Sequence, residues 1–582
     1  MLINKKMLGE SNPEQLLLYN IVGHTIKYMK YYNTMTTFFV DCYTSNVEQS
    51  KKIDNFLSLL DKSGVCYLLE KEIKIFESNI DKGGRPTYNP YNILAAILYS
   101  FAFGKGTLRD IEDKIKNDLR LIYIMQGDAP TYKAIGNFIN NYIVPNRDIV
   151  FSLITKAIFE ECKIKMSDMY LDGSKFEANA NKYKFVWKPT TFHTKLSDKV
   201  RNLLKEYGLA RGVPTSGIIE SKTIANKLIE LDKKIKGYDL TLKENKCHIK
   251  NYNLMVEYLT KSLEYEEKEG ICGPNRNSYY KTDKDSTAMC LKEDYYSGLG
   301  SNMHAAYNTQ ISVSNGLITA FLVTQSRNDI NDFIPLLDTH YNFYKEYPKR
   351  LCADSGYGSL ENYIYLDNHN IKNFVKYYSW QGNVSARNPS QYHLNDDETL
   401  TCLNGNIGFK VKLDWHHRKS GTTFFRVDNC IDCNFAQYCK RYMKDKGLDY
   451  KIFEVNTLLQ KYVQQSEENL LSVEGIEMRV NRSSQVEGAF GVIKQDFQYE
   501  RFRRRSLEKV STEFMLVCLG YNIRKLFRYF DGKAKFDYWK APANLIPETF
   551  KKPSAKKLSK KASNIKPKSV NEEAKRNYKY TK

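Results

Sequence analysis

The sequence contains no long apolar run, no evident secretion signal and no pair of histidines at a metal-binding spacing. The longest apolar stretch of the 582 residues runs from Ile93 to Phe103, whereas a membrane span needs ~18 residues. The first six residues lack the apolar segment of a signal peptide. His416 and His417 are adjacent, and adjacent side chains on a strand point apart. We therefore expect a cytoplasmic protein without a membrane role.

A disulfide framework is also not expected, because 12 cysteines in a chain without a secretion signal should stay reduced. Eight of them are scattered and are predicted to be core thiols: Cys42, Cys66, Cys162, Cys247, Cys272, Cys290, Cys352 and Cys518. The other four gather in one segment: Cys402, Cys430, Cys433 and Cys439. Four thiolates with one pair at two-residue spacing can form a tetrahedral zinc site. The alternative is four unrelated thiols in a loop-rich segment.

Basic residues are in excess, with 88 Lys and Arg against 67 Asp and Glu and a net charge of +21. Such an excess favours a nucleic-acid partner. Part of it lies in residues 551–582, which contain 12 basic residues and 2 Glu. This tail is predicted to be a solvated, disordered segment that would still raise nonspecific DNA affinity.

Apolar residues at three- and four-residue spacing predict helices from Ile53 to Tyr142, with a break at Gly83 to Pro86. Thr107 is placed to cap one of these helices. Several short helices with a basic surface predict an N-terminal DNA-binding or dimerisation domain over residues 1–150.

Strand patterns follow, alternating with helices. Five strands are predicted: Met169 to Asp172, Ala305 to Val313, Leu317 to Thr324, Arg350 to Ala353 and Ile371 to Tyr377. Asn315-Gly316 predicts a hairpin turn, and helices are expected over Asp329 to Tyr344 and Ser359 to Asn368. This order predicts an α/β fold with a ribonuclease-H-like mixed sheet as its core, formed by residues 151–190, 301–378 and 471–530.

Two long segments interrupt that core. Residues 191–300 are predicted to be a helical insertion, and a helical hairpin is favoured there over a coiled-coil dimer. Its apolar stripe consists of Ile224, Leu228, Leu231 and Ile235. Residues 379–470 have mixed strand and loop signals and are predicted to be a Cys-containing insertion. Residues 531–582 form the basic C-terminal tail.

Three acidic residues carry the predicted chemistry. Asp172 ends one apolar strand and Asp354 follows another, although either could be a simple turn former. Two carboxylates on neighbouring strand ends would repel unless a cation lay between them. Glu487 lies on a helix beside the apolar stripe of Val486, Phe490 and Ile493, where the alternative is a solvated charged helix.

Basic residues surround Glu487 in the sequence. Arg482 precedes it, and Lys494 follows two turns later on the same helix. A run of arginines comes next: Arg501, Arg503, Arg504 and Arg505. This arginine run is typical of a surface that contacts DNA phosphates beside a metal site.

Together these segments resemble the catalytic blocks of bacterial insertion-sequence DDE transposases. The three blocks are Tyr170 to Tyr183, Ala353 to Asn362 and Val486 to Lys494. Asn308 to Gln310, Arg327 to Asp329 and the helical stretch from Gly84 to Tyr142 agree with the same family. The resemblance covers residues from about 80 to about 530, and the order of the three blocks is specific to the family.

The resemblance implies that Asp172, Asp354 and Glu487 hold two Mg²⁺ or Mn²⁺ ions that cut and join DNA. It implies a transposase that binds the terminal inverted repeats of its element, cleaves the ends and transfers the strands. It also implies that Arg482 and Lys494, the basic residues on either side of Glu487, contact DNA near the cut. Double-stranded DNA is the expected partner, with a homodimer in the DNA complex. The alternatives are a metal-dependent DNA nuclease on the same fold and a catalytically idle DNA-binding protein, which the three intact acidic residues disfavour.

The chain departs from some relatives at one place. Their pattern is Tyr-x2-Arg-x3-Glu-x6-Lys, but Val480 and Ser483 stand at the tyrosine and arginine positions here, and the nearest arginine is Arg482. The spacing from Glu487 to Lys494 is retained. Similar transposases also have a comparable cysteine cluster, which supports the grouping of the four cysteines but not the presence of a metal.

Overall fold

This computed structural model describes residues 47–73, 88–104, 106–238, 243–292, 294, 297–298, 302–377, 380, 392–395, 397–411, 422–440, 443, 445, 447–534, 536 and 538–542. Four features predicted from the sequence lie outside these residues: Cys42, the break at Gly83 to Pro86, the pair His416-His417 and the tail 551–582. None of the described helices is both long enough and apolar enough to cross a membrane.

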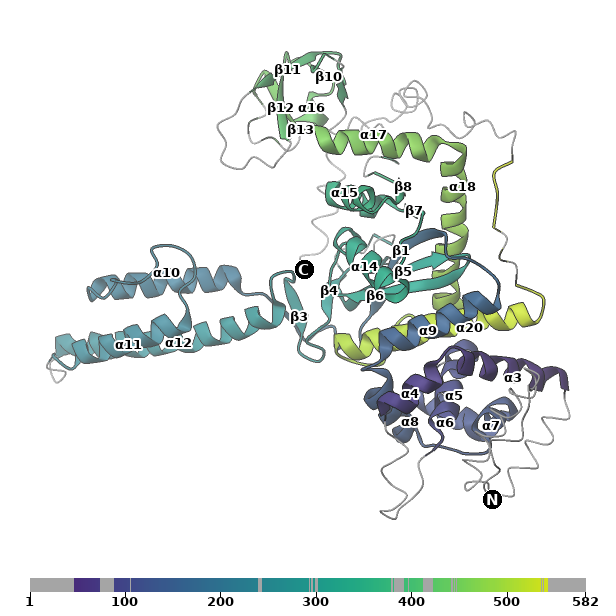
Figure 1. Cartoon of the computed structure of the whole chain (residues 1–582). Helices are drawn as coiled ribbons and strands as arrows, with labels where there is room; N and C mark the ends of the chain where they lie inside the picture. The colour runs from purple at the N-terminus through teal and green to yellow at the C-terminus, as the bar shows by residue number, and fades with distance from the viewer. Residues whose placement is uncertain are drawn as a thin grey trace.

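A six-stranded mixed sheet lies at the centre of the fold (Figure 1). Its strands are β1 (Asp168–Glu177), β4 (Thr287–Met289), β5 (His304–Ser314), β6 (Leu317–Thr324), β7 (Arg350–Ala353) and β8 (Lys372–Val375). Strand β5 pairs antiparallel with β1, β4 and β6, whereas β7 pairs parallel with β1 and β8. The five predicted strands are confirmed, and the fold is a mixed α/β one. Strand β4 is additional and comes from the range 191–300.

The hairpin between β5 and β6 forms where it was predicted. Asn315 has φ 48° and Gly316 has φ 74°, which is the left-handed pair that a two-residue hairpin turn requires. The backbone N–H of Gly316 donates to Oε1 of Gln485 over 2.8 Å. This bond joins the hairpin to the helical segment that carries Glu487.

Helix α20 (Leu507–Phe530) connects the sheet with the N-terminal helices, and every residue from Val510 to Ile523 is buried. It packs against β6 on one side and against α5 and α9 on the other. Phe514 of α20 contacts Phe176 of β1, and Phe527 contacts Phe56 of α3. The sheet and the N-terminal helices therefore share one hydrophobic core.

The N-terminal helices confirm the helical pattern of that part of the sequence. They are α3 (Val47–Lys62), α4 (Val65–Ile73), α5 (Pro90–Phe103), α6 (Leu108–Asn117), α7 (Leu119–Met125), α8 (Tyr132–Phe138), the π-helical η2 (Ile139–Ile143) and α9 (Arg147–Glu161). Thr107 caps α6 as predicted, because its hydroxyl accepts from the backbone N–H of Asp110 over 3.0 Å.

On the far side from α20, helices α14 (Phe333–Tyr344) and α15 (Leu360–Asn368) pack against the sheet. The short 3₁₀ segments η4 (Asp329–Asn331) and η5 (Ser355–Tyr357) precede them. Ser359 caps α15, since its hydroxyl accepts from the backbone N–H of Asn362.

A helical arm projects from the sheet between β1 and β4 (Figure 1). It contains α10 (Thr190–Glu206), α11 (Ser221–Ile235), η3 (Lys243–Asn245) and α12 (Lys246–Cys272). At its base β2 (Phe185–Trp187) pairs with β3 (Ser278–Tyr280), and the N–H of Lys188 donates to the carbonyl of Asn277 over 2.8 Å.

The apolar stripe predicted in this segment packs inside the arm. Ile224, Leu231 and Ile235 are buried in a small core with Val200 of α10 and Met255 of α12. Their partners are therefore in the same chain, and the arm has three helices rather than the two of the expected hairpin.

A second, antiparallel sheet of five strands carries the cysteine cluster. Its strands are β9 (Tyr392–Leu394), β10 (Leu400–Cys402), β11 (Ile407–Val411), β12 (Thr422–Asp428) and β13 (Tyr450–Asn456), with the short helix α16 (Ala436–Cys439). Helix α17 (Thr457–Leu471) then returns to the central sheet and packs against β8 and α15. It leads into α18 (Val473–Arg482).

Replacing Gly520 by alanine should destabilise the chain. A Cβ there would lie 2.6 Å from the carbonyl oxygen of Phe101, where α20 crosses α5, so backbone would have to move. Such overpacking costs about 1–3 kcal/mol, and we expect a lower midpoint of thermal unfolding.

Gly270→Ala on α12 is the matched control for this prediction. A Cβ at Gly270 would have no described atom within 4 Å. Alanine is better than glycine in an open helical position by up to ~1 kcal/mol, so this variant should be neutral or stabilised. Similar midpoints for the two variants would contradict a close crossing at Gly520.

Candidate active site

Asp172 lies in the interior of β1 and not at its end, which corrects the expectation from the sequence. It pairs with Ile311 of β5, and β1 continues to Glu177. Strand β7 pairs only with residues 168–170 of β1, so Asp172 comes just past the end of that pairing. Within the apolar run Met169 to Leu171, Tyr170 pairs with both β5 and β7, Met169 pairs with β7 and Leu171 with β5; the rest of the strand is more polar.

Asp354 follows β7 directly, as predicted, and starts the turn that continues into η5. Its Oδ1 lies 3.4 Å from Nζ of Lys376, which follows β8. Strand β7 lies between β1 and β8, and its carboxyl end is next to the part of β1 that contains Asp172. The turn that begins with Asp354 is therefore at the same edge of the sheet as Asp172. The parallel pairing of β1 and β7 thus brings two segments about 180 residues apart to one edge.

Glu487 lies on a helix with two π-helical stretches, and 52% of its side chain is exposed. The helix α18 continues through η6 (Ser483–Glu487), α19 (Gly488–Gly491) and η7 (Val492–Asp496). The predicted apolar stripe is confirmed, because Val486, Phe490 and Ile493 are all buried. π-Helical turns in helices often occur at functional sites.

Arg482 links the acidic residues. Its side chain is only 7% exposed, and Nη2 donates to Oε1 of Glu487 over 3.0 Å while Nη1 lies 3.7 Å from Oδ2 of Asp172. The hydroxyl of Ser483 donates to the other oxygen of Glu487 over 2.9 Å. Within the described residues Nη1 has no hydrogen-bond partner, although it is buried. The guanidinium therefore lies between carboxylates that come from separate elements.

The charges around Arg482 shift the pKa values of its neighbours. Burial raises the pKa of Asp172 to about 6, even though Arg482 and the backbone N–H of Gly173 act to lower it. Burial alone would also raise the pKa of Asp354, but Lys376, the N–H of Ser355 and Arg482 outweigh it and lower that pKa. Burial disfavours the charged guanidinium, yet Asp172 and Asp354 raise the pKa of Arg482 above its usual value.

The other predicted DNA-binding residues lie along the same helical segment and the strand-like stretch after it. Nζ of Lys494 lies 5.1 Å from the ring centre of Phe176, a residue of β1. Arg501 and Arg505 are exposed, whereas Arg503 and Arg504 are half-buried. Their backbone N–H groups donate to the buried carboxylate of Glu513. Part of the arginine run thus anchors the chain to α20, and Arg501 and Arg505 are the more accessible to a phosphate.

A network of polar side chains beside the sheet was not predicted from the sequence to have a function. Asn308 and Gln310 of β5 both donate to Oδ1 of Asp329, over 2.8 and 2.7 Å. Asn308 also donates to Asp332 over 3.0 Å, and burial raises the pKa of Asp332 to about 7. In the sequence, this network is represented only by two segments that agree with the family resemblance, Asn308 to Gln310 and Arg327 to Asp329. Asn308 and Gln310 are two residues apart on a strand, which predicts that their side chains share one face.

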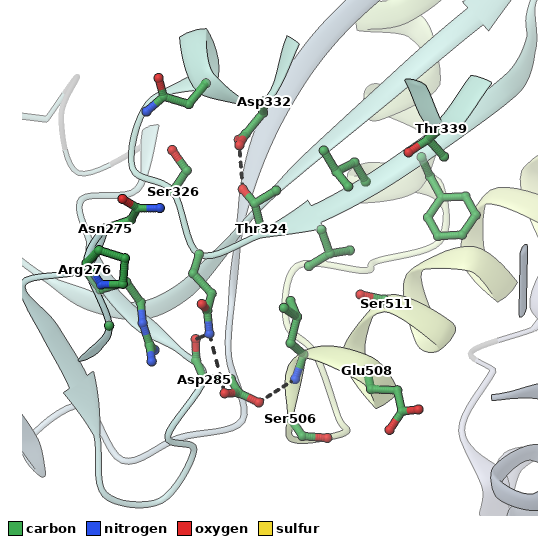
Figure 2. Close-up of a pocket in the computed structure, with 18 of the residues that line it drawn as sticks. Asn275, Arg276, Asp285, Thr324, Ser326, Asp332, Thr339, Ser506, Glu508 and Ser511 are labelled. Atoms are coloured by element: carbon green, nitrogen blue, oxygen red, sulfur yellow. Dashed lines mark hydrogen bonds between the residues drawn. The ribbon is translucent and has the colours of Figure 1, made fainter. Parts of the chain in front are cut away.

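A cavity of about 1390 Å³ lies apart from the three carboxylates, at the base of the arm (Figure 2). Its walls come from the end of α12, β6, the loop after β6, and the starts of α9 and α20. Thr324 donates to Asp332 there, and Asp285 accepts from the backbone N–H of Leu507 (Figure 2). Its charged lining consists of Arg147, Arg276, Asp148, Asp285, Asp332 and Glu508. Acidic residues outnumber basic ones, so the cavity does not suit a phosphate.

The four clustered cysteines line one small cavity of about 20 Å³. Cys402 ends β10, Cys430 and Cys433 follow β12, and Cys439 ends α16. Burial raises the pKa of Cys430, and the other three thiols raise it further. Lys451 donates to the sulfur of Cys439 over 3.0 Å. In the described part of the chain, no three His, Cys, Asp or Glu side chains are arranged so that they could hold a metal ion; this applies to the four cysteines and to Asp172, Asp354 and Glu487 alike.

Comparison with known families gives one match, at residues 401–527, to the family described as Transposase DDE domain. The match supports a DDE-type transposase. The matched region extends from the cysteine-bearing sheet to α20 and includes Glu487 and Lys494. It begins after Asp172 and Asp354, so neither of them is in it. No curated protein and no solved structure matches the chain. At the level of the family, the match supports an enzyme of transposition and recombination with a DNA partner, and such enzymes generally use divalent metals.

Replacing Asp172 by asparagine should stabilise the metal-free chain at pH 8. The pKa of Asp172 is raised to about 6, so the contribution of this group is favourable at low pH and is lost as the pH rises through 6. Removing the charge should therefore raise the free energy of unfolding by about 1–3 kcal/mol at pH 8, and by less at pH 5. Urea unfolding in the presence of a chelator measures both values.

Asp354→Asn is the matched control, with the opposite sign. Because the pKa of Asp354 is lowered, its carboxylate contributes stability above the unfolded pKa and loses it only as the pH falls below that value. This variant should be destabilised to a similar extent at pH 8 and pH 5. An Asp172→Asn variant that loses stability at pH 8 would rule out the proposed electrostatics.

Proposed function

We propose that the chain is a transposase that binds the terminal inverted repeats of an insertion sequence, cleaves the DNA ends and transfers them to target DNA. Asp172, Asp354 and Glu487 are the proposed catalytic residues. The observation that carries the proposal is the position of the buried guanidinium of Arg482. It lies 3.0 Å from Glu487 and 3.7 Å from Asp172, and its charge acts to lower the pKa of Asp354. Two of the proposed carboxylates, Asp172 and Glu487, thus contact one cation, and the same cation acts to lower the pKa of the third, Asp354.

The strand order supports a ribonuclease-H-like core for this enzyme. Three antiparallel strands, β6, β5 and β1, are followed by the parallel strands β7 and β8. Ligands of such sheets bind where strands end and the order changes. In this proposal the arm and the cysteine-bearing sheet are insertions into the core, which begins within α9 at residue 151, and the helices before it form the N-terminal domain.

The donor set fits Mg²⁺ or Mn²⁺, because these hard cations prefer carboxylate oxygens. Two such ions bound by Asp172, Asp354 and Glu487 would activate a water molecule and stabilise the leaving oxygen of the phosphodiester. Lys376 and Arg482 keep Asp354 ionised at neutral pH. Protonation of Asp172 below a pH of about 6 would compete with metal binding.

The DNA contacts in this proposal lie beside Glu487. Lys494 is on the same helical segment, and Arg501 and Arg505 offer exposed side chains further along, near the half-buried Arg503 and Arg504. Contacts of this kind hold the phosphate backbone and position it without reading the sequence. Arg482 would reach DNA only after leaving Glu487, because its side chain is buried against that carboxylate. A homodimer would hold the two ends of the element.

We also propose that Cys402, Cys430, Cys433 and Cys439 hold a structural Zn²⁺. All four line one cavity, and the backbone N–H of Phe435 donates to the sulfur of Cys433 over 3.4 Å. Gly405 closes a tight turn after Cys402, since its N–H donates to the carbonyl of Cys402 over 2.9 Å. Four thiolates complete a tetrahedral site, which leaves no open position for chemistry.

Purified protein should cleave DNA that carries the ends of its own element in the presence of Mg²⁺ or Mn²⁺. Glu487→Gln should reduce cleavage by roughly 10³-fold or more, the scale of losing one member of a catalytic set, while end binding in Ca²⁺ persists. Glu500→Gln, an exposed glutamate after the same helical segment, is the control and should cleave normally.

The products of that reaction separate the alternatives. Strand transfer of the cleaved ends supports a transposase, and cleavage without transfer supports a nuclease. Binding without any cleavage supports an idle DNA-binding protein. Cleavage that survives exhaustive chelation would exclude the two-metal mechanism.

Full-length protein should contain about one zinc per chain by elemental analysis. Cys433→Ser should lose this zinc and lower the midpoint of thermal unfolding, whereas Cys247→Ser, an exposed cysteine on α12, should keep it. Wild-type protein purified without zinc and unchanged in stability on its addition would show that the four thiols are not a metal site.

A further inference from the structure

Gln310 lies between the two segments that carry Asp172 and Asp354. It pairs across the sheet with Gly173, the residue after Asp172. A Cβ at Gly173 would be 2.5 Å from Nε2 of Gln310 and 2.6 Å from Oε1, so the amide lies flat across that glycine. A larger residue at position 173 would therefore displace this side-chain amide from its place.

The other end of the Gln310 amide is bonded to the turn after β7. Oε1 of Gln310 accepts a hydrogen bond from the hydroxyl of Tyr357, which is buried. Tyr357 ends η5, and its backbone N–H donates to the carbonyl of Asp354 over 3.1 Å. The hydroxyl of Tyr357 thus joins two parts of the site by a hydrogen bond. One is the turn that contains Asp354, and the other is the Gln310 side chain, which packs against β1.

Asp329 fixes the orientation of that amide. Its Oδ1 accepts from Nε2 of Gln310 over 2.7 Å and from Nδ2 of Asn308 over 2.8 Å. A carboxylate only accepts, and the buried hydroxyl of Tyr357 donates, so the amide has one satisfactory orientation between them. The other carboxylate oxygen of Asp329, Oδ2, lies near the turn after β7, because a Cβ at Gly356 would be 3.6 Å from it.

We propose that Asp329 is a positioning residue which, through Gln310 and Tyr357, sets the placement of the Asp354 turn relative to Asp172. The inference rests on the proposed function, because it concerns the residues that would hold the metal ions. Hydrogen bonds to the groups behind metal ligands commonly tune affinity, since they fix the direction of the ligands. The chain from Asp329 to Tyr357 acts on two ligand segments at once and touches neither carboxylate directly.

Mn²⁺ binding to the full chain, measured by calorimetry without DNA, tests this chain of hydrogen bonds. Asp329→Ala and Tyr357→Phe should each weaken Mn²⁺ binding by about 10-fold. The double variant should bind no more weakly than the weaker single variant, because both changes break one chain. Asp329→Asn keeps an oxygen that accepts from both amides and should restore most of the affinity.

Tyr365→Phe on α15 is the matched control. Tyr365 also donates to an aspartate, Asp338, but this pair is exposed and belongs to α15 and α14 rather than to the turn. It should bind Mn²⁺ as the wild type does. The Mg²⁺ concentration for half-maximal DNA cleavage should rise in the same variants that lose Mn²⁺ affinity.

The outcomes separate this inference from the proposed function. Wild-type Mn²⁺ affinity in both single variants, or effects that add in the double variant, would overturn the positioning role even if the protein cleaves DNA. Weaker binding in the variants of a protein that fails to cleave would support the role and count against the transposase. A wild-type chain that binds no Mn²⁺ would overturn both.

Discussion

The buried charge of Arg482 is the constraint on which the candidate site depends. A guanidinium with 7% of its side chain exposed would be costly alone, so its position requires carboxylates beside it. Glu487 and Asp172 meet that need directly. The side chain of Glu487 is 52% exposed, whereas burial raises the pKa of Asp172 in spite of the neighbouring cation. The elements that bring them there, β1, the end of β7 and the helix with its π-helical turns, are consequently tied together by charge as well as by apolar packing.

Much of the fold followed from sequence patterns, because most of its strands and helices have one buried face. The predicted strands β5 to β8 and the cap at Thr107 are confirmed. Strand β4 was missed because three residues, Thr287–Met289, are too short to show alternation, and pairing with β5 alone makes them a strand. Asp172 was predicted to end its strand because the apolar run stops at Leu171, but β1 continues beside β5 to Glu177.

The candidate site was predictable in its residue types but not in its internal contacts. Motif order pointed to Asp172, Asp354 and Glu487, and no spacing indicated that Arg482 would lie inward between two of them. Its predicted contact with DNA came from the family resemblance, whereas the burial of its side chain depends on the turn geometry of η6. The bonds from Asn308 and Gln310 to Asp329 likewise join residues about 20 positions apart on different elements, which no local pattern reveals.

The narrow base of the arm has a further consequence for chain length. The residues that enter and leave it, Lys188 and Asn277, are held together by a backbone hydrogen bond of 2.8 Å. The entropy of closing a loop grows only with the logarithm of its length, and the arm offsets that with its own core around Leu231 and Met255. The arm therefore constrains the strands on either side of it much as a short turn would. Its length can change without altering the pairing of β1 with β5.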